Sequence, residues 1–179
     1  MSDNGRLLKT MTPWDLAYVV DMAIACGISY AIITRALVSF VDRPDDLLGG
    51  MWAVVATIFV FRDSRESSLA AGRDRLIATG VSFALCLAYF LIFPFTPMGM
   101  VIVIGVGSVG MMLIGRRDDI VTTGITSAVV MVAAALSPHQ TWHQPILRLI
   151  DTVVGIGVGV SCKWVGSYVF YRMAGEPVR

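Results

Sequence analysis

Two arginines occupy matching places in the sequence and could attract an anion. The segment Arg75–Thr79 reads RLIAT and, 73 residues later, Arg148–Thr152 reads RLIDT, so four of the five residues agree. A guanidinium stays positively charged and is well shaped to hold a carboxylate. At the bilayer centre a charged side chain costs at least about 2.5–3.5 kcal/mol, so it usually faces a cavity or a partner. If these segments lie in a membrane, both arginines are candidates for binding an anionic substrate.

Small and polar residues follow each arginine at helical spacing. The face after Arg75 carries Thr79, Ser82, Cys86 and Tyr89, and the face after Arg148 carries Thr152, Gly155, Gly159 and Cys162. Glycines four residues apart favour close helix packing for the second face. The first face is equally consistent with packing and with a substrate path. The residues expected to line such a path are Arg75, Thr79, Ser82, Tyr89, Arg148 and Thr152.

Three further charged residues fall inside apolar stretches. Asp21 and Lys163 are predicted at similar depth, so they could form a pair, with Asp21 as the carrier of a coupled proton. Alternatively, Lys163 extends its ammonium to the inner interface along its own stem. Asp151 follows Arg148 by three residues, so these two can neutralise each other on one helix face. The alternative partner for Asp151 is Arg35, near the outer surface.

The composition places these residues in a membrane protein. The chain has 179 residues, of which 56% are hydrophobic and 15% charged, and its net charge is +1. Its mean hydropathy is +0.73. A soluble domain is usually about 45–50% apolar and about 25% charged. The composition therefore excludes an ordinary soluble domain, a disordered chain and a basic nucleic-acid-binding protein, and it argues against an enzyme.

Apolar stretches, two of which contain a few charged residues, predict six transmembrane helices in an all-α bundle. A helix needs roughly 20 apolar residues to cross a bilayer. The longest uncharged stretch, Leu76–Gly115, is broken by Pro94 and Pro97 into two spans joined by a tight hairpin. The other spans are expected at Thr12–Phe40, Leu47–Phe61, Ile120–Ser137 and Ile146–Tyr171.

Basic residues predict the orientation of these helices. Lys and Arg in short loops resist translocation. They gather near the N-terminus, in the loops after the second and fourth helices and in the C-terminal tail, whereas the opposite loops hold few. We therefore expect a multi-pass protein with both termini in the cytoplasm.

Other patterns are not expected to carry chemistry. Gly105–Gly110 has the spacing of a dinucleotide-binding fingerprint, but it lies inside an uncharged span and lacks the strand that would precede it. His139 and His143 are expected in a loop after Pro138, without nearby Cys or carboxylate ligands. The cysteines have no metal-binding spacing. No metal, no cofactor and no nucleophilic site is expected.

The matching arginine segments also indicate an internal repeat within a single membrane domain, residues 1–179. The same offset brings the second predicted span over the fifth. A three-helix unit must reverse its direction when it is repeated, and inverted repeats are a recurring transporter architecture. We expect repeat one at about residues 12–93 and repeat two at about residues 98–172, with the substrate route between them.

Four motifs along the chain belong together. Trp52–Val54 opens a short second helix, and the polar stretch Ser67–Gly72 leads into a basic residue. Arg75–Gly80 has the form Arg-x-x-x-Thr-Gly, and Arg148–Gly155 has the form Arg-x-x-Asp-Thr-x-x-Gly. Over nearly the whole chain, these motifs resemble the fusaric acid resistance (FUSC-like) and aromatic acid exporter family of bacterial membrane proteins.

The resemblance implies a six-helix domain in the bacterial cytoplasmic (inner) membrane that exports aromatic or other organic carboxylates. Arg75 and Arg148 would attract the carboxylate, Tyr18, Trp52 or Tyr89 would stack on an aromatic ring, and Asp21 would carry a coupling proton. Many members of this family have a large cytoplasmic domain and a second membrane half. A homodimer of this chain is therefore expected, because it would restore two copies of the membrane unit. Two alternatives stay open: a dimeric organic-anion channel, as in the related aluminium-activated malate channels, and a non-transporting membrane assembly protein.

Overall fold

The computed structural model describes residues 13–36, 43–136 and 143–174. In these residues six α-helices and one short 3₁₀-helix form, and no strand occurs. In chain order they are α2 (Pro13–Ala36), α3 (Arg43–Val60), α4 (Arg65–Ile92), α5 (Pro97–Leu113), η1 (Arg117–Asp119), α6 (Ile120–Leu136) and α7 (His143–Ala174). The predicted all-α architecture is confirmed.

The helices have the length and composition of membrane spans. Four stretches within the described residues are long and apolar enough to cross a bilayer: Asp15–Arg35, Arg65–Ile92, Arg117–Leu136 and His143–Val169. The apolar helices Leu47–Val60 and Pro97–Leu113 are shorter. A helix of 17 residues, such as α5, rises about 26 Å, slightly less than a hydrocarbon core of about 30 Å.

The hairpin between α4 and α5 lies where the prolines predict it. The hydroxyl of Thr96 caps α5 by accepting a hydrogen bond from the backbone N–H of Gly99 at 3.0 Å. Pro97 follows at the first helical position, where a missing N–H does no harm. The hydroxyl of Tyr89 lies 2.9 Å from that of Thr96. A Cβ at Gly99 would collide with the Tyr89 ring, so glycine makes room for it.

Two sequence patterns lie in helices. Gly105–Gly110 sits inside α5, as the absence of a preceding strand indicates. The placement of His143 in a loop was wrong, because His143 is the first residue of α7. Pro145 follows in the first turn, where the absence of its N–H is tolerated, so the helix can begin before it. His139 lies outside the described residues, as do the predicted span ends at Thr12, Phe40 and Ser137.

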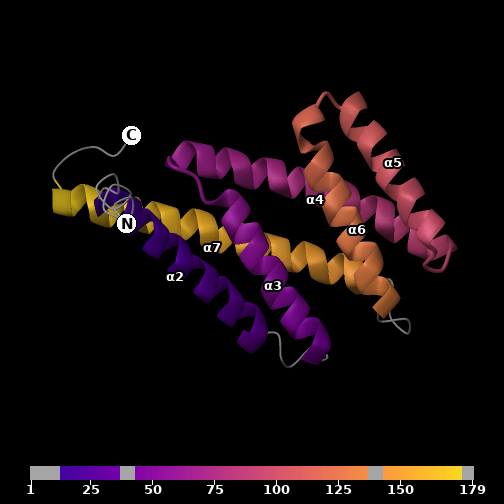
Figure 1. Cartoon of the computed structure of the whole chain (residues 1–179), viewed down its shortest axis with the longest axis horizontal. Helices are drawn as coiled ribbons and strands as arrows, with labels where there is room; N and C mark the ends of the chain where they lie inside the picture. Colours follow the sequence, from indigo (N-terminus) through magenta and orange to yellow (C-terminus); the bar gives the residue numbers. More distant parts are fainter. Residues whose placement is uncertain (1–12, 37–42, 137–142, 175–179) are drawn as a thin grey trace, which may run out of the picture.

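The long helices α4 and α7 run side by side along the molecule (Figure 1). The pair α2 and α3 packs against α7, and the pair α5 and α6 packs against α4. Within each pair the two helices also contact each other. The bundle therefore consists of two central helices, α4 and α7, and two helix pairs. The pair α2 and α3 packs on α7, and the pair α5 and α6 packs on α4.

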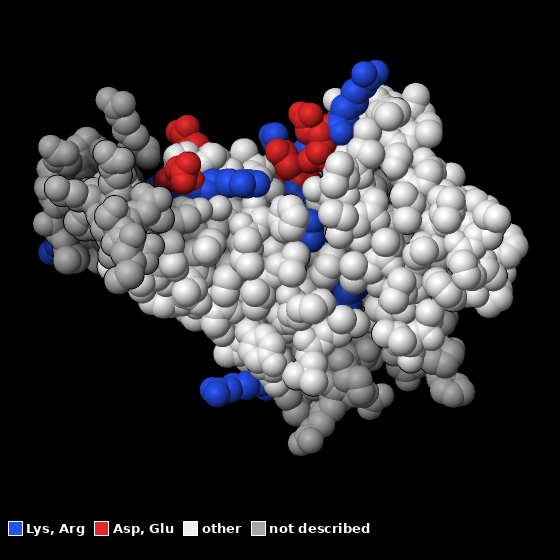
Figure 2. All heavy atoms as spheres, in the orientation of Figure 1, with Lys and Arg blue, Asp and Glu red and all other residues white. Residues whose placement is uncertain are grey.

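Charged side chains gather at one end of this bundle. Figure 2 shows them over the beginning of α4 and the connection between α5 and α6, while the rest of the face is largely uncharged. This end holds the two loops between α3 and α4 and between α5 and α6. Gly115, with φ of 79°, turns the chain after α5 in a conformation that L side chains rarely adopt. The loops with basic residues thus lie at one end of the bundle, as their spacing predicts.

The interior is more polar than the surface, which is opposite to a soluble fold. Along α2, the side chains of Leu16, Val20, Ile24 and Ile28 are exposed. Buried positions include arginine, glutamine and many threonines and serines. An apolar outer surface around polar contacts is typical of a helical bundle in lipid.

Candidate functional site

Arg75 of α4 is buried against α3 and has no hydrogen-bond partner among the described residues. Its side chain is 3% exposed. None of its nitrogens, Nε, Nη1 and Nη2, forms a hydrogen bond to the described residues. Its guanidinium carbon lies 4.4 Å from the centre of the Phe59 ring and 5.3 Å from that of Trp52. The cation therefore lies over two aromatic rings, while its N–H groups have no hydrogen-bond acceptor among the described residues.

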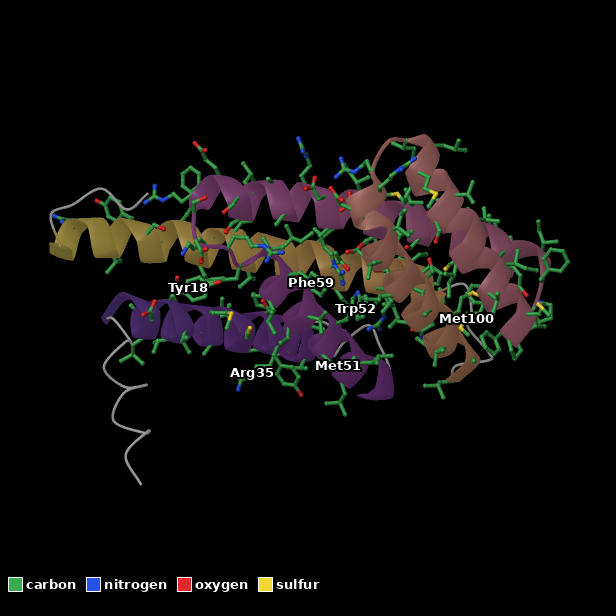
Figure 3. All side chains as sticks on the ribbon, turned by 45° about the horizontal axis from the view of Figure 1, so that its top comes forward. Tyr18, Arg35, Met51, Trp52, Phe59 and Met100 are labelled. Atoms are coloured by element: carbon green, nitrogen blue, oxygen red, sulfur yellow. The ribbon has the colours of Figure 1, made fainter. Side chains whose placement is uncertain are left out.

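The two aromatic rings come from α3. Trp52 and Phe59, labelled in Figure 3, are seven residues apart, so they lie two turns apart on one helix face. Cation–π contacts of this kind contribute about 0.5–2 kcal/mol. These contacts do not replace hydrogen bonds, so the N–H donors of the buried guanidinium still lack acceptors among the described residues.

Trp52 links Arg75 to the beginning of α7. Its indole Nε1 donates a hydrogen bond to the hydroxyl of Thr152 at 3.1 Å. Thr152 in turn donates to the backbone carbonyl of Arg148 at 2.8 Å. The structure therefore brings Arg75, Trp52, Thr152 and Arg148 into one connected cluster, although α3, α4 and α7 are separate in the sequence.

Arg148 differs from Arg75 in having an acidic partner. Its Nη1 lies 2.9 Å from Oδ2 of Asp151, and the Arg148 side chain is 1% exposed. This is the pairing on one helix face that the three-residue spacing predicts. Arg35, the alternative partner considered for Asp151, is exposed at the end of α2. Arg75 and Arg148 thus have different electrostatic surroundings.

Polar groups also occupy the contact between α4 and α6. Ser82 donates to the carbonyl of Thr123 at 2.9 Å, and the thiol of Cys86 lies 3.9 Å from the carbonyl of Ser127. The hydroxyls of Thr79, Thr123 and Ser127 are buried and have no hydrogen-bond partner among the described residues. The α4 stripe predicted from Arg75 onward therefore faces α6, and this contact contains one unpartnered hydroxyl from α4 and two from α6 among the described residues.

Tyr89 does not join this cluster. It is fourteen residues beyond Arg75 on the same helix, a rise of about 21 Å. Its hydroxyl contacts Thr96 in the hairpin. The structure therefore separates this predicted path residue from the buried arginine.

Asp21, Tyr18 and Lys163 form a second group where α2 meets α7. The Lys163 ammonium is buried, 4.9 Å from the centre of the Tyr18 ring and 5.4 Å from that of Phe61. Tyr18 donates from its hydroxyl to the carbonyl of Phe61 at 3.1 Å. The half-buried carboxylate of Asp21 interacts electrostatically with Lys163, but the two form no salt bridge within the described residues. Gly166 makes room for this carboxylate, with which a Cβ would collide.

A pocket of about 350 Å³ connects the charged end of the bundle with Arg75. Its walls include Phe59, Asp74, Arg75, Asp119 and Thr122. The pocket therefore reaches the unpartnered guanidinium from the end where the charged loops lie.

Arg116 spans the rim of this pocket. It forms salt bridges to Asp74 of α4 and to Asp119 of η1, the latter at 2.7 Å. The hydrogen bond from Arg116 to Asp74 and, to a smaller extent, the one to Asp119 raise the pKa of Arg116 above its ordinary value. This bridge ties the α5–α6 connection to α4.

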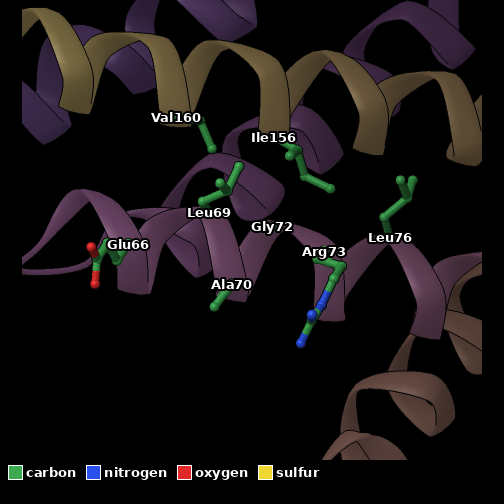
Figure 4. A pocket seen from close by; sticks show the side chains of 8 residues that line it. All are labelled: Glu66, Leu69, Ala70, Gly72, Arg73, Leu76, Ile156 and Val160. Atoms are coloured by element: carbon green, nitrogen blue, oxygen red, sulfur yellow. The ribbon is translucent and has the colours of Figure 1, made fainter.

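A groove of about 580 Å³ between α4 and α7 has no comparable polar group (Figure 4). Leu69 and Leu76 of α4 point toward Val160 and Ile156 of α7, and Gly72 lets the helices approach. The charged side chains at its edge point away from this apolar surface. The groove is therefore a packing surface between two spans rather than a binding site for an anion.

Sequence reasoning did not single out Phe59, Thr123, Ser127 or the bridging role of Arg116. The seven-residue spacing from Trp52 could have indicated Phe59. Thr123 and Ser127 are four residues apart on one helix face, which is a weak signal. Nothing in the sequence indicates which of several nearby carboxylates Arg116 would meet.

The fold and the site define a class: multi-pass helical membrane proteins with charged residues buried among their helices. Residues 31–162 match the family described as fusaric acid resistance protein-like. The match covers more than half of the chain, so the protein belongs to this family, and the predicted resemblance is confirmed. It is thus a membrane protein related to transport and efflux. No curated protein and no solved structure matches the chain.

Proposed function

We propose that the protein exports organic carboxylates, including aromatic ones, and that Arg75 binds the carboxylate group. The observation that carries this proposal is the buried guanidinium of Arg75, which has no hydrogen-bond partner among the described residues. Burying a cation without a partner costs several kcal/mol. An anion that enters through the pocket at Arg75 would remove this cost on binding, whereas a neutral solute would not.

The surroundings of Arg75 favour a carboxylate over other anions. A carboxylate accepts two parallel hydrogen bonds from one edge of a guanidinium. The guanidinium carbon lies over the rings of Phe59 and Trp52, and its three nitrogens have no hydrogen-bond partner among the described residues, so they are available to the ligand. Aromatic side chains beside the site offer apolar contact to an aromatic ring of the substrate. Tyr18 lies with Lys163 in the other group, so we propose Trp52 rather than Tyr18 as the first aromatic contact.

We further propose that six helices cross the membrane as two inverted repeats, α2–α4 and α5–α7. The packing supports this division. When the helices of one repeat are exchanged for those of the other, each helix contact has a counterpart: α2–α3 with α5–α6, α3–α7 with α4–α6, and α2–α7 with α4–α5. The short spans α3 and α5 would then be accommodated by local thinning of the bilayer.

Asp21 is proposed to carry the proton that drives export. It is a carboxylate within a span, half-buried beside Lys163, where gain of a proton would change the local charge. Intramembrane carboxylates of this kind serve proton relays in transporters. A channel would need no such group, so dependence of flux on a pH gradient separates the two mechanisms.

A homodimer in the bacterial cytoplasmic membrane, with both termini in the cytoplasm, completes the proposal. A groove of about 740 Å³ between α2 and α7 leaves Asp21 among exposed apolar side chains. A second copy over this groove would shield the carboxylate from lipid. Cross-linking of cysteines introduced at Val20 tests the dimer directly.

The export proposal is tested with everted membrane vesicles and labelled benzoate. Wild-type vesicles should accumulate benzoate but not the neutral analogue benzamide, and an imposed pH gradient should increase the rate. Arg75→Gln should abolish accumulation. Arg73→Gln is the matched control, because Arg73 is two residues away but 71% exposed. Absence of flux for every carboxylate in a panel, or full flux in Arg75→Gln, would contradict the proposal.

A further inference from the structure

The two hairpins of the bundle are held to the central helices by unequal contacts. In the repeat, Ser82 and Cys86 of α4 correspond to Gly155 and Gly159 of α7. The first two face α6, and the second two face α3. These are equivalent contacts by position, but their chemistry differs.

The α3–α7 contact is tight, and the Thr57 hydroxyl within it is hydrogen-bonded. A Cβ at Gly155 would collide with the carbonyl of Ala53, so the backbones touch. The hydroxyl of Thr57 lies 2.9 Å from the carbonyl of Ala53 and 3.0 Å from that of Gly155. Ser29 of α2 lies 2.6 Å from the same hydroxyl. Thr57 thus joins three helices, and opening the α3–α7 contact would break its bond to Gly155 together with the bond from Trp52 to Thr152.

The α4–α6 contact is looser in its hydrogen bonding. Thr79, Thr123 and Ser127 each bury a hydroxyl that has no partner among the described residues. Leaving a buried hydroxyl unpaired is unfavourable, whereas an open contact would let it bind water or a ligand. Thr79 lies one turn after Arg75 on α4, and the Arg75 nitrogens also have no hydrogen-bond partner in the part of the chain that the structure describes. Hydroxyl donors suit a carboxylate that leaves the guanidinium.

At the charged end, the α4–α6 contact is closed by the Arg116 bridge. Arg116 joins Asp74 of α4 to Asp119 of η1, immediately before α6. Both carboxylates line the pocket that leads to Arg75. Release of this bridge would free the α5–α6 hairpin from α4 at the mouth of the pocket.

We infer that the bundle opens along the α4–α6 contact to pass the carboxylate from Arg75 to the hydroxyls of Thr79, Thr123 and Ser127, and that the Arg116 bridge holds this contact closed. The α3–α7 contact stays shut during the movement. The inference rests on the proposed export function for its substrate, but the opening itself can be observed without transport.

Alkylation of a buried cysteine measures the opening. Cys86 in the α4–α6 contact and Ala56, which lies against Gly155 in the α3–α7 contact, are both 0% exposed. The first protein keeps Cys86 and carries Cys26→Ala and Cys162→Ala; the second carries Ala56→Cys with all three native cysteines replaced by alanine, so the Thr57 hydroxyl stays in place. In membranes treated with N-ethylmaleimide, the α4–α6 thiol should react at least about tenfold faster, since labelling follows the opening equilibrium. Equal rates would overturn the inference.

The role of the bridge is tested in the same assay. Arg116→Gln should accelerate labelling of Cys86 roughly two- to fivefold, the size expected for a partly exposed ion pair. Asp74→Asn removes the salt bridge between Arg116 and Asp74. This variant is used in the same labelling assay if Arg116→Gln does not fold. Arg73→Gln is the control, because Arg73 also pairs with Asp74 but on the same helix. Unchanged labelling in both bridge variants would refute the bridge as the closing element.

A disulfide then connects the opening to transport. Ser127→Cys places a thiol opposite the native Cys86, and oxidation should stop benzoate flux until the disulfide is reduced. The control pair Ser29→Cys and Thr57→Cys joins α2 to α3 and should leave flux intact when oxidised. Flux that continues through the oxidised Cys86 pair would overturn the inference while leaving the export function standing. Faster labelling of Cys86 without any carboxylate flux would support the opening and refute the export function.

Discussion

Replacing Arg75 by methionine is expected to stabilise the protein while it removes carboxylate binding. Methionine fills a similar volume without a charge. The substitution loses cation–π contacts worth about 0.5–2 kcal/mol, but it also removes an unpaired buried cation that costs several kcal/mol. A net gain of about 1 kcal/mol would raise Tm by about 2–4 °C in a chain of this size.

The same substitution should weaken binding strongly. Two charge-assisted hydrogen bonds of about 1.5 kcal/mol each give a loss of at least about 3 kcal/mol, which corresponds to about 150-fold in Kd. Both quantities come from one assay: thermal unfolding of the purified protein in detergent across a series of benzoate concentrations. The wild-type Tm should rise with benzoate, and the Tm of Arg75→Met should start higher and stay constant.

Arg148→Met is the matched comparison and should behave in the opposite way. Here the arginine is paired with Asp151 at 2.9 Å, so its removal takes this counter-charge away from a buried carboxylate. Breaking a buried ion pair in this way costs about 3–5 kcal/mol, which predicts a fall in Tm of about 6–20 °C. If Arg75→Met is instead destabilising, or still binds benzoate like the wild type, the argument that Arg75 is held ready for an anion is refuted.

Three further predictions concern packing, the cluster and coupling. Gly155→Ala should lower Tm, since its Cβ would collide with a carbonyl of α3, whereas Gly157→Ala, with nothing within 4 Å, should not; equal Tm values would contradict the close contact. Trp52→Phe should lower the free energy of unfolding by about 1 kcal/mol, because the hydrogen bond to Thr152 is lost, and the measurement is a lower Tm. Retained benzoate flux in this variant would show that an aromatic ring at position 52 is enough for transport. An unchanged Tm would mean that the hydrogen bond does not contribute to stability. Asp21→Asn should make benzoate flux in vesicles independent of an imposed pH gradient, and a persisting response would exclude Asp21 as the coupling group.

Sequence patterns predicted the helices well because each depends on local chemistry. Long apolar stretches must become helices in a bilayer, where every backbone group needs a partner within its own segment. The prolines before α5 and the charges between the other helices set the ends of these segments. His143 was misplaced because a proline in the first turn is compatible with a helix that begins before it.

The candidate site was predicted in part. Arg75, Thr79, Arg148 and Thr152 stand out because a charge or a hydroxyl in an apolar helix is unusual and repeats along the chain. Their neighbours from other helices could not be read in the same way, since contacts such as that of Phe59 depend on how three helices cross.

By itself, the sequence determined that this chain is a helical membrane protein of the fusaric acid resistance protein-like family, with charges concentrated at one end and two related arginines among its helices. Only the tertiary structure decided that the two arginines are unlike. Arg148 has Asp151 one turn away on its own helix, which spacing alone can indicate. Arg75 lies between two rings of α3 with unused N–H groups, and that follows from packing between helices, which no local pattern encodes.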